Sequence, residues 1–228
     1  MRASITTLLA ACALLAACGK TPPPAAPEPD PVPKPEKKQM GAWGELGVLD
    51  QGKVRSTFER LWQNDMEACH QHGNDFVGGD FTVRVRINHQ GGVKWAYLAS
   101  STIGDRNVEK CVLDVVRKAT WPIPQEGDDG VAEQELSFAV ASERPALDWD
   151  PAIARKAVEQ ESGKLSHCHA KGPITATVIV KPDGSVLSAG AYGPDENSED
   201  AVDCVVDVLR ETKFPKPGSW TAKATFEN

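Results

Sequence analysis

The stretch CVLDVVRKATWPIP at residues 111–124 returns 93 positions later as CVVDVLRETKFPKP at residues 204–217. Seven of the 14 aligned residues are identical, including the cysteine and both prolines. The same offset pairs FTVRVRINHQGGV at 81–93 with ITATVIVKPDGSV at 174–186. Self-similarity at a fixed spacing indicates that one supersecondary unit occurs twice. The chain is therefore predicted to contain a duplicated module.

The residue pattern predicts the same order of elements in each copy. Residues 81–87 alternate between apolar and polar side chains, as in a strand with one buried face, and Gly-containing turns predict a hairpin in both copies. Apolar residues three and four positions apart predict a helix over 53–70, its counterpart near 151–168, and second helices over 106–119 and 199–211. Final strands are predicted at 133–140 and 221–226. The order helix, strand, strand, helix, strand predicts an α+β fold with helices on one face of a small antiparallel sheet.

Four cysteines belong to the repeats, two in each copy. Four cysteines allow three connectivities, which spacing alone does not separate. Because each copy keeps a pair of its own, we expect disulfides Cys69–Cys111 and Cys168–Cys204. Such bonds would tie the two predicted helices of each copy together.

The amino-terminal residues predict export and lipidation. An apolar run after Arg2 ends in Leu-Ala-Ala-Cys, which resembles a bacterial lipobox. We expect residues 1–17 to be a signal peptide and Cys18 to carry the lipid, palmitate included. Residues 18–40 hold the lipidated cysteine and a proline-rich tether, and two modules follow at 41–143 and 144–228. The expected location is the outer membrane, facing the periplasm.

Composition limits the partners. The formal net charge of −7 argues against nucleic acid and against docking on anionic lipid. The nucleophile-elbow, phosphate-loop and zinc-protease motifs do not occur. We therefore expect no enzyme activity, no cofactor and no small-molecule substrate.

A helix ending in cysteine, a hairpin with a central glycine, SSTIGDRNVEKCVLDVVRKATWPIP at 100–124 and a closing strand occur in this order. This pattern resembles the AgmX/PglI C-terminal domain, which is similar in fold to the TonB C-terminal domain. The resemblance covers residues 45–140, and the second copy matches it more loosely. It implies a non-enzymatic interaction module in the cell envelope, linked to gliding motility or envelope transport, with envelope proteins as partners. The lipid expected on Cys18 would attach the chain to the membrane.

Two further sets of residues are candidates for binding. Arg84 and Arg86 lie on the outward face of their predicted strand, and Trp95 has only Ser188 at the corresponding position, so these three residues are a candidate partner surface. The alternative function is a metal- or redox-responsive binding protein, because histidines flank the leading cysteines. The candidate ligands for that function are His70, His72, His167 and His169.

Overall fold

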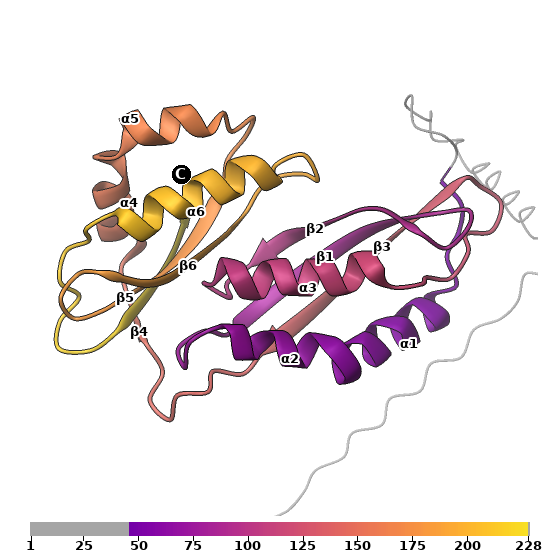
Figure 1. The fold of residues 1–228 in the computed structure, drawn as a ribbon, viewed down its shortest axis with the longest axis horizontal. Helices are drawn as coiled ribbons and strands as arrows, with labels where there is room; N and C mark the ends of the chain where they lie inside the picture. The colour runs from indigo at the N-terminus through magenta and orange to yellow at the C-terminus, as the bar shows by residue number, and fades with distance from the viewer. Residues whose placement is uncertain (1–45, 228) are drawn as a thin grey trace, which may run out of the picture. The chain divides into compact units, whose positions relative to one another are not determined.

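The computed structural model describes residues 46–227, which form a mixed α+β fold with two small sheets (Figure 1). The expected signal peptide, the lipidation site Cys18 and the proline-rich tether lie outside the described residues.

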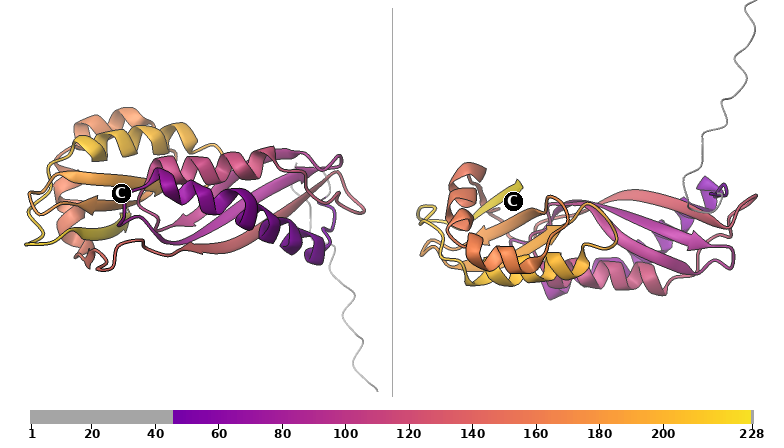
Figure 2. Two further views of the ribbon diagram at one scale, coloured as in Figure 1. Left: turned by 60° about the horizontal axis from the view of Figure 1, so that its bottom comes forward. Right: turned by 90° about the horizontal axis from the view of Figure 1, so that it is seen from above.

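The first half contains three α-helices, a π-helical turn, a 3-10 turn and three strands. Its elements are α1 Gln51–Leu61, a π-helical turn Trp62–Met66, α2 Glu67–Cys69, a 3-10 turn His70–His72, β1 Gly79–Asn88, β2 Val93–Ser101, α3 Arg106–Lys118 and β3 Asp129–Phe138. The strands form an antiparallel sheet in the order β2-β1-β3. Figure 2 shows the helices on one side of this sheet.

The period-two pattern of β1 places its apolar side chains in the core. Phe81, Val83 and Val85 are fully buried, whereas Arg84 on the opposite face is exposed. Helix α3 covers the buried face and begins at Asp105, whose carboxylate accepts hydrogen bonds from two backbone amides of the first turn. The predicted second helix and the central strand therefore both form where the sequence indicates.

The predicted helix over 53–70 is not a regular α-helix. Its buried residues Leu61 and Met66 are five positions apart, which is more than one turn of an α-helix. The wider π-helical turn at Trp62–Met66 absorbs the extra residue and keeps both side chains directed at the core.

The second half repeats the arrangement with one addition. Its elements are β4 Leu147–Asp148, α4 Pro151–Glu159, α5 Ser162–Leu165, a 3-10 turn Ser166–Cys168, β5 Thr175–Val180, β6 Val186–Tyr192, α6 Glu199–Glu211 and β7 Ala222–Glu227. The sheet order is β4-β7-β5-β6.

Strand β4 makes the second sheet four-stranded and mixed, where an antiparallel sheet of three strands was expected. It runs parallel to β7, with Leu147 N–H donating to Thr221 O and Trp149 N–H donating to Lys223 O, both at 2.9 Å. Two residues are too few for an alternating pattern to be visible in the sequence, which is why the prediction missed this strand.

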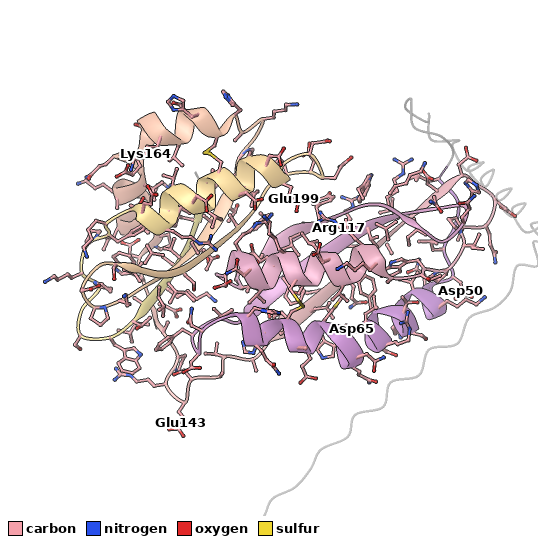
Figure 3. The ribbon with its side chains drawn as sticks, in the orientation of Figure 1. Asp50, Asp65, Arg117, Glu143, Lys164 and Glu199 are labelled. Atoms are coloured by element: carbon pink, nitrogen blue, oxygen red, sulfur yellow. A yellow bond between two sulfur atoms is a disulfide. The ribbon has the colours of Figure 1, made fainter. Side chains whose placement is uncertain are left out.

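Both cysteine pairs lie where the repeat predicts them. One disulfide joins Cys69, at the end of α2, to Cys111 on α3, and the other joins Cys168, at the end of the 3-10 turn Ser166–Cys168, to Cys204 on α6. Figure 3 draws the sulfur atoms between the helices. In each half the bond holds two helices over one sheet.

The two halves contact each other through the second sheet. Thr177 and Ile179 lie on the face of β5 opposite its helices, and both are buried against Gly104 of the first half. Asn74 donates a hydrogen bond of 2.9 Å to the Ser188 hydroxyl. Strands β2 and β6 also lie side by side. One face of the second sheet is therefore covered by the first half.

Loss of either disulfide is expected to destabilise the protein strongly, because each closes a loop of 42 or 36 residues in the unfolded chain. The paired substitutions Cys69→Ala/Cys111→Ala and Cys168→Ala/Cys204→Ala should each lower the free energy of unfolding by about 4 kcal/mol. Urea denaturation followed by tryptophan fluorescence measures this change. If both paired variants lost less than about 1 kcal/mol of unfolding free energy, the stabilisation expected from closing these loops would be contradicted.

Candidate interaction surfaces

The three residues of the candidate partner surface lie together on the open face of the first sheet. Arg86 is paired across β1 and β2 with Trp95, and Arg84 is paired with Tyr97. The rings of Trp95 and Tyr97 are in contact, with centroids 5.5 Å apart. The alternation of β1 and of β2, together with this pairing, brings all of these side chains to the side away from α3.

Arg86 does not belong to an accessible surface. Its side chain is only 12% exposed, and its guanidinium lies 2.7 Å from the carboxylate of Asp129. Lys94 lies 2.8 Å from the same carboxylate. Burial raises the pKa of Asp129, but the hydrogen bonds from Lys94 and Arg86 outweigh it and leave the pKa lowered. Arg86 therefore neutralises a buried carboxylate and ties β1 to β3.

Arg84 is more accessible. Its side chain is 46% exposed and lies 3.5 Å from Glu133 on β3, and its guanidinium donates to the Tyr97 hydroxyl at 3.4 Å. Exposed ion pairs of this kind contribute little to stability. Arg84 therefore remains accessible on the open face, beside the half-buried rings of Trp95 and Tyr97.

An edge of the first sheet lies next to this face. Strand β3 is bonded to β1 on one side only. Its start is covered by the chain around Leu46–Val48, where Gly47 N–H donates to Asp129 O at 2.7 Å. Among residues 46–227, no strand pairs with the other edge of β3 beyond this point.

A groove runs between this edge and helix α1. Its volume is about 460 Å³. Phe58, Trp62 and Leu136 supply its apolar lining, and the ring of Trp62 stacks on Phe138 with centroids 5.0 Å apart. The remaining lining residues are polar: Arg55, Glu59, Gln63, Gln134 and Ser137. The groove is thus an apolar slot with a polar rim, beside an unpaired strand edge.

The corresponding edge of the second half is shorter and covered. Strand β7 is the counterpart of β3, but it has six residues where β3 has ten. Strand β4 occupies its outer side at Ala222 and Lys223. The two copies therefore differ most at the edge that a partner strand could use.

The histidines named as candidate ligands have other contacts or lie apart. His70 Nε2 lies 2.8 Å from Val77 O, and its ring stacks on Phe138. His167 Nδ1 lies 2.8 Å from Gly163 O. His72 and His169 are exposed. Within residues 46–227 no group of three potential metal ligands comes together, and the neighbouring cysteine sulfurs are in disulfides.

The carboxyl group with the most strongly shifted pKa is that of Glu109, which the sequence did not indicate as a candidate. Glu109 on α3 is completely buried where the halves meet. Its carboxylate accepts from the Ser101 hydroxyl at 2.7 Å and from Ala191 N–H of the second half at 3.1 Å, and Arg106 lies 3.6 Å away. Burial raises its pKa to about 7, while Arg106 and the hydrogen bonds oppose the rise and Asp105 adds to it.

The pKa of Glu109 would suit a general acid, but its buried carboxyl group is not accessible to a substrate. The cavity that its neighbour Arg106 lines with Leu98 and Val202 has a volume of about 20 Å³, which is too small for a substrate. The carboxyl group is enclosed by protein and joins two parts of the fold. A comparison of the two repeats could have revealed this buried position. The residue of the second copy that corresponds to Glu109 is the apolar Val202.

No family model, no curated protein and no solved structure matches this chain. Within the described part of the chain, no helix has the length and apolar character needed to cross a bilayer.

The raised pKa of Glu109 predicts a pH-dependent stability. Between its unfolded value of 4.5 and about 7 the folded protein holds the extra proton, so the contribution of Glu109 to stability is lost as the pH rises through this window. Glu109→Gln should remove up to roughly 3 kcal/mol of this dependence.

The measurement is the free energy of unfolding in urea at pH 5 and at pH 8. Glu143→Gln, in an exposed turn, is the matched control and should keep the pH dependence of the parent protein. If the free energy of unfolding changed equally between pH 5 and pH 8 in the parent and in Glu109→Gln, the raised pKa of Glu109 would be refuted.

Proposed function

We propose that this protein is a non-enzymatic adaptor of the bacterial cell envelope that binds a partner protein along the edge of β3. The observation that carries the proposal is the unpaired edge of β3 beside the groove lined by Phe58, Trp62 and Leu136. Adding a partner strand to such an edge supplies backbone hydrogen bonds, and pockets for alternate side chains supply specificity.

The backbone of β3 favours this mode of binding. Asp129 O faces away from β1, because it accepts from Gly47 N–H. Backbone groups alternate in direction along a strand, and β3 pairs with β1 without a register shift. The N–H groups of Val131, Glu133, Glu135 and Ser137 therefore point outward. A strand paired there would place every second side chain over the groove.

The open face extends the surface. Glu133 and Arg84 lie on that face next to the edge, and Trp95 and Tyr97 follow across the sheet. Aromatic and arginine side chains are enriched where proteins bind each other. The remaining side chains of a bound strand would lie against this rim.

The resemblance to the AgmX/PglI C-terminal and TonB C-terminal domains supports the same function. It accounts for two modules, at 41–143 and 144–228, in a chain that begins with a lipobox-like sequence. The protein would be held by the lipid on Cys18 at the outer membrane, facing the periplasm. Gliding motility or envelope transport is the process that it would serve.

A proline on the edge tests the proposal. Glu135→Pro removes an outward N–H without touching the hydrogen bonds to β1, and proline is tolerated at such positions. We expect the variant to fold with nearly unchanged thermal stability but to lose its partner. Glu135→Ala, which keeps the N–H, should retain it.

The measurement uses photo-crosslinking in the native host, with a photoreactive residue in place of Gln134, which lines the groove. Crosslinked products should form in the parent and in Glu135→Ala and disappear in Glu135→Pro. Crosslinks of equal yield in all three proteins would mean that partners bind elsewhere.

A further inference from the structure

Several contacts between the halves join residues that correspond in the repeat. Lys110 and Asp203 are 93 positions apart and form a salt bridge. Arg106 and Glu199 have the same separation and lie 3.8 Å apart. Strands β2 and β6 also correspond, and they lie side by side. Contact between equivalent positions is the mark of a twofold, isologous interface near its axis.

The charges at these positions are opposite. Helix α3 presents cations and helix α6 presents carboxylates. Arg106 lies 2.7 Å from Asp203, and Arg117 binds Glu199 (Figure 3). In a pair of two first repeats, Lys110 would face Lys110, and in a pair of two second repeats, Asp203 would face Asp203. The charges therefore favour a first repeat beside a second one.

Shape makes the same distinction. Glu109 of the first repeat lies against Gly190 of the second, where an added Cβ would overlap Glu109 Oε1. The first repeat has Tyr97 at the position of Gly190, and the second has Val202 at the position of Glu109. In a pair of two first repeats, the side chain of Tyr97 would therefore occupy the place where Gly190 leaves room for Glu109. The glycine and the buried carboxylate are complementary only in the mixed pair.

Two surfaces summarise this match. The α3 surface is Arg106, Glu109 and Lys110, and the α6 surface is Gly190, Glu199 and Asp203. We propose that residues 46–227 are a fused dimer in which the α3 surface accepts the α6 surface of the second repeat and rejects another first repeat. This inference is independent of the partner site on β3.

The amide of Ala191 reports whether the halves are docked. It lies on edge strand β6 and donates to Glu109 of the other half, so its protection depends on docking. The amide of Val178 lies on β5, which is flanked by strands of its own sheet, and reports the folding of the second half alone. Hydrogen exchange followed by NMR on the whole chain measures both.

Two variants break the match in different ways. Lys110→Asp gives the first repeat the residue of the second and places a carboxylate opposite Asp203. Its control is Lys118→Asp, the same change on the same helix, where the lysine is 80% exposed and pairs only loosely with Asp114. Gly190→Ala places a methyl group against Glu109, and its control is Gly163→Ala, where nothing lies within 4 Å of the new carbon.

We expect Lys110→Asp and Gly190→Ala to speed exchange at Ala191 roughly tenfold or more while Val178 stays protected. Both controls should exchange like the parent.

The inference is overturned if the Ala191 amide of the parent exchanges as fast as a free amide, or if the two variants exchange like their controls. Because Lys110 is 46% exposed and lies outside both cores, Lys110→Asp should fold even if Gly190→Ala does not. If Lys110→Asp lost protection at both Ala191 and Val178, the inference would also be overturned. The second half would then unfold whenever the halves separate, and docking could not be distinguished from folding.

Discussion

The covalent link between two helices is the constraint on which each half depends. In each half one face of the sheet is buried by helices, and two helices must stay side by side to cover it. The bonds Cys69–Cys111 and Cys168–Cys204 fix that spacing at the point where the first helical segment of each half ends. Small domains with limited cores commonly rely on such links. The second helix then lies over the sheet with its apolar stripe inward.

With the framework held in this way, the two copies could diverge on their other faces. In the first half the face away from the helices carries Arg84, Trp95 and Tyr97. In the second half the corresponding positions are Thr177, Ser188 and Gly190, and they are buried against the first half. Small side chains there allow a close approach, whereas aromatic and charged ones leave the face open. One duplication has thus produced a face for internal docking and a face left for others.

Much of this fold could be predicted from local sequence, because the relevant forces act between neighbours in the chain. The alternation in β1 and the cap at Asp105 both act within a few residues. The repeat itself gave the disulfide partners. The π-helical turn at Trp62–Met66 is visible only once the five-residue gap between buried positions is compared with the period of a helix.

The contacts that could not be predicted from the sequence join residues that are far apart in the chain. Glu109 looks like an ordinary polar position of a helix until Ala191 is brought against it. Arg86 looks like an exposed cation, but Asp129 lies beside it across the sheet. In both cases the contact that reveals the role of the side chain is made with a residue more than 40 positions away. Pattern analysis identifies which face a side chain is on, but not what covers that face.

The bridge at Leu46–Val48 also has a mechanical meaning. Any pull on the chain that precedes it reaches the folded body first through a few backbone bonds, from Gly47 to Asp129 and between Val48 and Gln125. These bonds would rupture before force reached α1 and the cross-linked core behind it. Tension on the preceding chain would therefore free the start of β3 first and lengthen the unpaired edge of that strand, while α1 and the cross-linked core stayed intact.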